Sequence, residues 1–129
     1  MPQADIDGPQ RKIIRSEVRP LRTEHGTNGI PLRSGRTLPF SFYRGWNAPS
    51  GYYTEAWFLV HPETREVLFE GPSLVRLIRG LPAVTDVSDE IRESFSLDPG
   101  RYLIVLALDG QQAAEIEVEA AEIPAEEAA

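Results

Sequence analysis

The sequence predicts an all-β fold, an antiparallel β-sandwich of about seven short strands. Apolar and polar residues alternate in several short runs, as they do in half-buried strands. Turn residues separate these runs, most clearly Pro99-Gly100 and Asp109-Gly110. No series of helical patterns alternates with the strands, so a parallel α/β sheet is not indicated.

The first half of the chain contains four expected strands and one long connection. Residues 11–20 alternate and form an amphipathic edge strand that Pro20 ends. Residues 23–36 are polar and lack a hydrophobic period, which predicts a long loop. The remaining strands of this half are expected at 37–44, 52–61 and 66–70. Of these, 52–61 is apolar on both faces, which is typical of a strand inside a sheet.

Residues 72–81 support two interpretations. Four apolar residues have the spacing of one helical face: Leu74, Leu77, Ile78 and Leu81. The segment spans only about two helical turns, and such short helices are marginal, so an irregular strand remains equally open. Further strands are expected at 82–88, 91–97, 102–108 and 111–120. The strand at 102–108 is again apolar on both faces, and 111–120 alternates apolar residues with glutamates.

Length and composition limit the organisation and the partners. Residues 1–10 are predicted to be a flexible arm, 11–120 the β-sandwich domain, and 121–129 an acidic tail. The net charge of −7 argues against general binding of nucleic acid. There is no apolar run of ~20 residues and no basic start followed by an apolar stretch. We therefore expect a cytoplasmic or virion protein without a secretory signal and without a membrane partner.

The residues Leu97-Asp98-Pro99-Gly100-Arg101-Tyr102 resemble a corner found in immunoglobulin-like and fibronectin type III-like domains. The resemblance covers residues 37–120 and implies an immunoglobulin-like β-sandwich, not an activity. It implies that the Tyr102 hydroxyl bonds to the backbone a few residues upstream, and that Trp57 is the buried tryptophan of the third strand. The cysteine pair of antibody domains is absent, because the chain has no cysteine. The residues assigned structural roles are Trp57, Leu97, Pro99, Gly100 and Tyr102.

The sequence shows no catalytic set, so we predict that the protein is not an enzyme and needs no cofactor. His25 and His61 are isolated, and neither G-x-S-x-G nor a phosphate-binding glycine motif is present. Asp86, Asp89 and Glu90 form an acidic cluster that could offer oxygen ligands to calcium. The EF-hand spacing is absent, so no metal site is predicted, and a calcium-dependent adhesion module is kept as an alternative.

Aromatic and basic residues are the candidates for contacts with a partner. The rings around residues 43–53 either plug the end of the core or form an exposed surface that anchors a protein or stacks on a sugar. Positive charge is concentrated in residues 1–44 and negative charge in the rest, which would be complementary between subunits. The predicted partner-binding residues are Arg15, Arg19, Arg22, His25, Arg33, Arg36, Tyr43, Trp46, Tyr52 and Tyr53.

These observations predict a non-enzymatic structural or protein-interaction domain that contacts other protein subunits, identical or different, in a larger assembly. A concrete form of this hypothesis is a phage virion accessory protein, either a capsid decoration protein or a tail component. The alternative from another class is a carbohydrate- or ligand-binding module that uses the loop aromatics.

Overall fold

The computed structural model describes residues 12–20, 29–80 and 82–123, and within the first of these ranges only the side chain of Val18. The described residues form ten strands and no helix, which confirms the predicted all-β class. No helix that could cross a bilayer is found in this part of the chain. The strands are β1 (Lys12–Pro20), β2 (Ile30–Arg33), β3 (Arg36–Thr37), β4 (Phe40–Asn47), β5 (Gly51–Val60), β6 (Val67–Glu70), β7 (Leu74–Ile78), β8 (Thr85–Ile91), β9 (Gly100–Leu108) and β10 (Gln111–Glu122).

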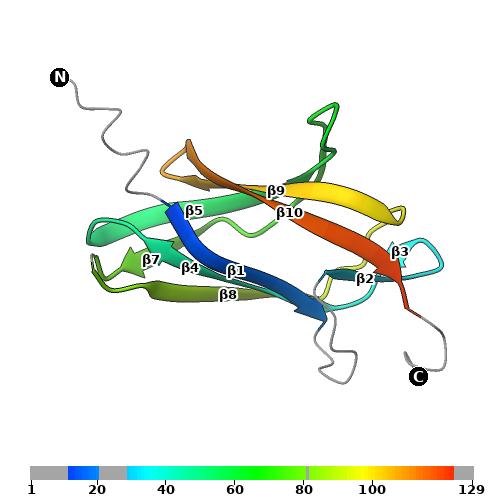
Figure 1. Cartoon of the computed structure of the whole chain (residues 1–129), viewed down its shortest axis with the longest axis horizontal. Coiled ribbons are helices and arrows are strands. Elements are labelled where there is room, and N and C mark those ends of the chain that lie inside the picture. The colour runs from blue at the N-terminus through cyan, green and yellow to red at the C-terminus, as the bar shows by residue number, and fades with distance from the viewer. Residues whose placement is uncertain (1–11, 21–28, 81, 124–129) are drawn as a thin grey trace.

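The strands form two sheets that enclose one core (Figure 1). The smaller sheet has three strands in the order β1-β4-β8. The larger sheet has seven strands in the order β3-β2-β10-β9-β5-β6, and β7 pairs with β5 beyond the end of β6. The sheets meet where β1 approaches β2, because the Gly29 N–H donates to the Val18 carbonyl at 2.5 Å. They are not paired to each other at the opposite side, where β7 and β8 lie (Figure 1).

The predicted antiparallel sandwich and its resemblance to immunoglobulin-like and fibronectin type III-like domains are wrong. The larger sheet is mixed, because β2 pairs in parallel with β10, and it is strongly curled in the manner of a half-barrel. In this pairing Ile30 lies opposite Ala120 and Leu32 opposite Glu122. The strand β2 lies inside the stretch that was predicted to be a loop. Its apolar run is only three residues long, which is too short for a periodic signal.

The strand pairing also shows how residues 72–81, which the sequence left open between helix and strand, and the expected strand at 91–97 are folded. Residues 74–78 form the strand β7 rather than a helix, with Leu77 opposite Tyr52 and Val75 opposite Thr54. The predicted strand at 91–97 is wrong, since β8 ends at Ile91 and the chain then runs beside β3 instead. There the Thr37 N–H donates to the Phe95 carbonyl at 2.9 Å, which covers the edge of β3. The last strand, β10, extends two residues beyond the expected boundary at 120.

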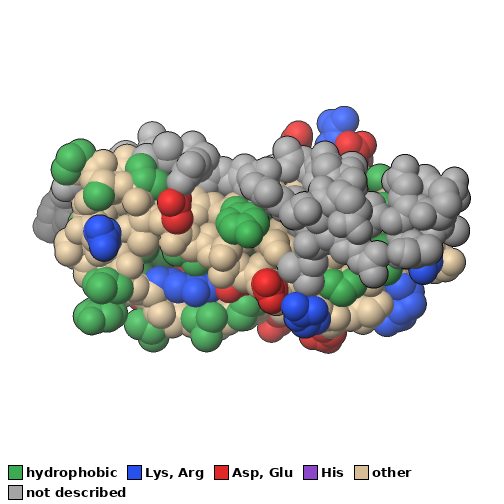
Figure 2. Space-filling model, turned by 90° about the horizontal axis from the view of Figure 1, so that it is seen from below, with side chains coloured by type: hydrophobic (Ala, Val, Ile, Leu, Met, Phe, Trp, Pro, Cys, Tyr) green, Lys and Arg blue, Asp and Glu red, His purple; other side chains and the backbone are tan. Residues whose placement is uncertain are grey.

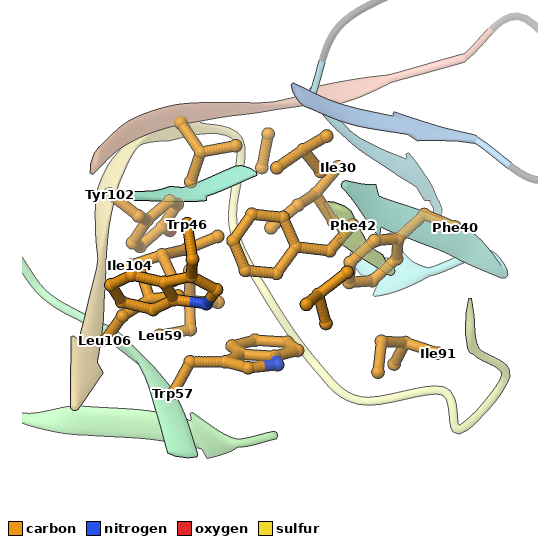
Figure 3. Close-up of a cluster of buried hydrophobic side chains, with 14 of the residues drawn as sticks. Ile30, Phe40, Phe42, Trp46, Trp57, Leu59, Ile91, Tyr102, Ile104 and Leu106 are labelled. Atoms are coloured by element: carbon orange, nitrogen blue, oxygen red, sulfur yellow. The ribbon is translucent and has the colours of Figure 1, made fainter. Parts of the chain in front are cut away.

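The core is apolar and fills the space between the two sheets (Figure 3). The rings of Phe42 and Trp57 meet edge to face, with centroids 5.1 Å apart. The sequence correctly places the 52–61 and 102–108 segments inside a sheet, since β5 and β9 each pair with strands on both sides. Only their inner faces are fully buried. The outer residues, such as Phe58 and Val105, are partly exposed.

The predicted corner hydrogen bond is present although the predicted family is not. The Tyr102 hydroxyl donates to the Asp98 carbonyl at 2.7 Å, and Leu97 beside it is buried while Pro99 is exposed. Tyr53 makes the same contact with the carbonyl four residues before it, that of Pro49, also at 2.7 Å. The hydrogen bond from a tyrosine hydroxyl to the carbonyl four residues earlier is therefore a local turn contact, formed by both Tyr53 and Tyr102. It does not identify a family.

Candidate functional site

Four charged side chains lie in the space between the sheets and form what we call the charged cluster: Arg44, Glu55, Arg76 and Asp89. Each comes from a different strand, β4, β5, β7 and β8, at a position whose side chain faces inward. The side chains of Arg44 and Glu55 are 0% and 1% exposed, and Arg76 is the most exposed at 19%. The cluster therefore joins the two sheets near their unpaired side.

Each arginine of the cluster contacts both carboxylates. Arg44 Nε lies 2.9 Å from Glu55 Oε2, and its Nη2 contacts Glu55 Oε1 and lies 2.9 Å from Asp89 Oδ2. Arg76 repeats the arrangement from the other side, with Nε 3.1 Å from Glu55 Oε1 and Nη2 2.6 Å from Asp89 Oδ1. Two cations and two anions alternate, so the cluster has no net charge. This compensation offsets the cost of burying them.

Two tryptophans complete the cluster from the core side. The Trp46 indole N–H donates to Glu55 Oε2 at 2.6 Å, and that of Trp57 donates to Asp89 Oδ2 at 3.1 Å. Figure 3 shows both rings within the hydrophobic cluster, where only their N–H groups require a polar partner. The Arg44 guanidinium also lies over the Phe42 ring, 4.6 Å from its centroid. Aromatic rings and charged groups therefore form one continuous packing unit.

The geometry leaves the cluster without a group that is free for chemistry. Every oxygen of Glu55 and Asp89 accepts at least one hydrogen bond. Burial raises the pKa of Asp89, but the charge of Arg44 and hydrogen bonds from Trp57, Arg76 and Arg44 outweigh it, so the pKa lies below its ordinary value of 3.8. A carboxylate held in its charged form and fully bonded is a poor general acid or base. The cluster therefore fastens the sheets together.

The charged cluster was not predicted, although the sequence contains a signal for it in the form of charged residues at inward strand positions. Glu55 lies between the core residues Tyr53 and Trp57, and Arg44 lies between Phe42 and Trp46. A charged residue at the inward position of an otherwise apolar strand requires an oppositely charged partner, because an unpaired buried charge is costly. Two such residues of opposite sign in consecutive strands could have been paired with each other.

The acidic cluster proposed for calcium is divided between two faces of β8. Asp89 faces inward and belongs to the charged cluster, whereas Asp86 and Glu90 face outward and are exposed. Alternation along the strand prevents the three carboxylates from converging. Among the described residues, no group of three metal-ligating side chains comes together. The calcium alternative has no support in this geometry.

The predicted aromatic surface is only partly present. Trp46 is 0% and Tyr53 7% exposed, so they fill the core and cannot meet a partner, which corrects the prediction for both. Tyr43 and Tyr52 are 42% and 73% exposed, but Tyr43 lies on the smaller sheet and Tyr52 on the larger one. A shared sugar-stacking surface is therefore not formed. The reason is that Trp46 and Tyr53 occupy inward positions of β4 and β5.

The predicted basic residues fall into three groups. Arg33 and Arg36 are exposed at the turn between β2 and β3, and Arg36 donates to Ser94 and Ser96 rather than pointing freely into solvent. Arg15 and Arg19 belong to β1, opposite Gly45 and Ser41 of β4, and their side chains are not described. The two other predicted residues, Arg22 and His25, lie outside the described residues.

Exposed apolar side chains gather at one corner of the larger sheet, in what we call the β5–β7 patch: Tyr52, Val75 and Leu77. Their exposed fractions are 73%, 66% and 55%. Leu74 is also 45% exposed, but it lies opposite the inward-facing Glu55 and therefore belongs to the other face of the sheet. Tyr52 lies directly opposite Leu77 in the pairing of β5 with β7. Figure 2 views the side of the molecule with β7 and β8 and shows hydrophobic side chains gathered at one end of it. The cluster member Arg76 lies between Val75 and Leu77 in sequence and faces the opposite way.

No family model and no curated protein matches the chain. Among solved structures, it is similar to part of the Pseudomonas fluorescens alkylpurine DNA glycosylase AlkC bound to DNA with an abasic site analogue, at 16% identity and a TM-score of 0.44. That match covers 86% of this chain and 30% of the glycosylase. It is also similar to part of the β-glucosidase EmGH1 from Erythrobacter marinus, at 11% identity and a TM-score of 0.48, over 86% of this chain and 15% of that one.

A β-glucosidase from Listeria innocua is similar at the same level, with 10% identity, a TM-score of 0.43, and coverage of 85% of this chain and 16% of that one. This chain therefore spans less than a third of each of these proteins. Likeness this low says nothing about activity, and the correction of the predicted family rests on the mixed, curled sheet.

Proposed function

We propose that this chain is a non-enzymatic protein-interaction domain that joins a larger assembly through the β5–β7 patch. The observation that carries the proposal is that three exposed apolar side chains lie side by side at one corner of the larger sheet, with Leu77 directly opposite Tyr52. Seven large hydrophobic residues among those described are well exposed, and three of them lie in this patch. Contiguous apolar patches are uncommon on monomeric proteins and usually mark contacts with other molecules.

The charged cluster supports the non-enzymatic part of this proposal. Its carboxylates and guanidiniums are paired with one another, and each of the two indole N–H groups adds a hydrogen bond to one oxygen of a carboxylate. The cluster also fixes Arg76 and with it the strand that carries Val75 and Leu77. A patch held by such a support is ordered before a partner arrives, which lowers the entropic cost of binding.

The narrower hypothesis of a phage virion accessory protein, a capsid decoration or tail component, belongs to the same proposal. It rests on the small size of the domain, the missing catalytic motifs and the separation of charge along the chain. Mass spectrometry of purified virions tests it directly. Absence of the chain from virions, with the chain present in the infected cells, would reject it.

A photo-crosslinking experiment tests the interaction surface. A photoreactive amino acid replaces Val75 in the patch, and in the matched control it replaces Ser88, which is exposed on the outer face of the smaller sheet. In cells that produce the protein naturally, we expect position 75 to give discrete adducts and position 88 to give none. Equal adducts from both positions, or none from position 75, would reject the patch as the interaction surface.

A further inference from the structure

The strand β7 has one edge that is paired with β5 and a second edge that no described strand covers. We infer that this free edge receives an extended strand from a partner protein, which adds to the larger sheet beside β7. The inference deepens the proposed function, since it states how the β5–β7 patch is used and what kind of segment fits it. Added strands gain affinity from backbone hydrogen bonds and selectivity from alternate side chains.

The edges of the other outer strands are covered by neighbouring segments or carry charged side chains. Residues 94–97 run beside β3, with Leu97 N–H donating to the Gly35 carbonyl at 3.0 Å. Strand β1 approaches β2 through the contact between Gly29 and Val18. Strand β8 presents exposed polar and acidic residues, and β6 is flanked by glutamates at 66 and 70. Charged side chains on edge strands are a common protection against unwanted pairing. Strand β7 has no acidic residue, its one arginine faces inward, and its outward residues Val75 and Leu77 are apolar.

The outward side chains of β7 define the chemistry of the incoming strand. Val75, Leu77 and Arg79 follow one another at every second position, and all three are exposed. Residues 74–80 contain two arginines and no acidic residue, although the whole chain has a net charge of −7. Arg76 is compensated within the charged cluster, while Arg79 has no ion pair with a described carboxylate. The outer row therefore offers two apolar positions followed by one positive charge.

Side chains directly opposite each other on antiparallel strands interact, with preference for apolar pairs and for opposite charges. An antiparallel partner strand would place its residues against Arg79, Leu77 and Val75 in that order. The segment that fits is therefore acidic–x–apolar–x–apolar, where x denotes residues that face inward. A basic residue in the first position would oppose Arg79 and would be disfavoured.

The inner face of β7 keeps the edge in place. Ile78 is 0% exposed, and Arg76 is fixed by Glu55 at 3.1 Å and by Asp89 at 2.6 Å. The strand thus has one row of side chains anchored in the molecule and the other row free. This arrangement presents the backbone edge in an extended form before a partner binds, and leaves the outer row for recognition.

Selection from a random displayed dodecapeptide library against the full chain tests the inference. We expect enrichment of acidic–x–apolar–x–apolar sequences. A synthetic peptide of the enriched sequence should protect the amides of Val75 and Leu77 from hydrogen exchange, whereas the Arg79 amide already donates to Thr85 Oγ1 at 2.9 Å. The double variant Val75→Lys/Leu77→Lys should bind this peptide roughly tenfold or more weakly, because burial of either side chain contributes more than a factor of ten. Ser88→Lys, on the other sheet, is the control and should bind normally.

The variant Arg79→Glu tests whether the charge at this position contributes to recognition, or whether the peptide binds through apolar contacts alone. In this variant a peptide with lysine in the first position should bind better than its acidic counterpart, which reverses the preference of the wild type. Enrichment without a pattern, unprotected β7 amides, or an unchanged preference in Arg79→Glu would each overturn strand addition. If binding depends on Val75 and Leu77 while the β7 amides stay unprotected, the patch is an interaction surface but not a strand acceptor. The crosslinking experiment at position 75 tests the proposed function independently of strand addition.

Discussion

Arg44 and Glu55 form a two-point ion pair between the sheets, with Nε 2.9 Å from Oε2 and side chains that are 0% and 1% exposed. They lie on consecutive strands, eleven positions apart. A slip of either strand by one residue would turn its charged side chain outward and leave the other charge buried alone. Since an unpaired buried charge is strongly destabilising, this pair fixes the position of β4 in one sheet relative to β5 in the other.

Replacement of Glu55 by Gln should be severely destabilising. The substitution keeps the size of the side chain but removes the charge that compensates Arg44 and Arg76. Loss of one partner from a buried ion pair costs about 3–5 kcal/mol, and urea denaturation followed by tryptophan fluorescence measures this change. Glu63→Gln, at an exposed turn, is the control and should stay within about 0.5 kcal/mol of the wild type. Equal effects of the two substitutions would contradict the role of the cluster.

Asp89 should make stability depend on pH in the acid range. Its pKa in the folded protein lies below the ordinary value of 3.8, so the unfolded chain binds this proton more readily. The stabilisation is fully present above the unfolded pKa and is lost as the pH falls through the lower folded pKa. Asp89→Asn should therefore be less stable than the wild type at pH 7, with a difference that shrinks below about pH 4. Thermal unfolding from pH 7 to pH 2 tests this, and a constant difference would refute it.

The hydroxyl of Tyr102 should contribute measurably to stability. It donates to the Asp98 carbonyl at 2.7 Å, and the side chain is only 7% exposed. Tyr102→Phe should lower the free energy of unfolding by about 1–3 kcal/mol, because the carbonyl loses its partner. Tyr52→Phe is the matched control, since this tyrosine is 73% exposed. Indistinguishable midpoints for the two variants would show that the corner bond carries no stability.

Gly71 should not tolerate a side chain. Its N–H donates to the Trp57 carbonyl at 2.9 Å, and a Cβ at this position would lie 2.6 Å from Trp57 Cζ2. Gly71→Ala should cost about 1–3 kcal/mol, the usual range for overpacking, and should alter the near-ultraviolet circular dichroism of the tryptophans. The nearby exposed Ser73→Ala serves as the control. If Gly71→Ala left both stability and the spectrum unchanged, the close contact with Trp57 would be disproved.

Local patterns in the sequence predicted local structure well. Alternation identified β1 and β10, segments that are apolar on both faces identified β5 and β9, and the resemblance of residues 97–102 to a known corner correctly placed the hydrogen bond of Tyr102. Each of these features depends on residues close together in the chain. The family assignment failed because it extended one such local feature to a global topology.

Features that depend on distant residues could not be predicted in the same way. The three apolar residues of β2 become a strand only because β10 lies beside them, ninety positions later for Ile30 and Ala120. Residues 74–78 fit a helical face as well as a strand until their pairing with β5 is known. The β5–β7 patch follows from that pairing, since Leu77, which a helix would have placed on its apolar face, is left exposed beside Tyr52. Only Tyr52 among its members was predicted to contact a partner.

The parallel pairing of β2 with β10 has a consequence for biosynthesis. The backbone groups of β2 that face β10 have no partner until the ribosome has synthesised β10, about ninety residues later. In the same way, the N–H groups of Ser34 and Gly35 wait for the Glu122 carboxylate, which they contact at 2.9 Å. Contacts between distant residues slow folding, because a long loop must close first. This side of β2 must therefore stay unpaired during synthesis until β10 has been made and can fold back beside it.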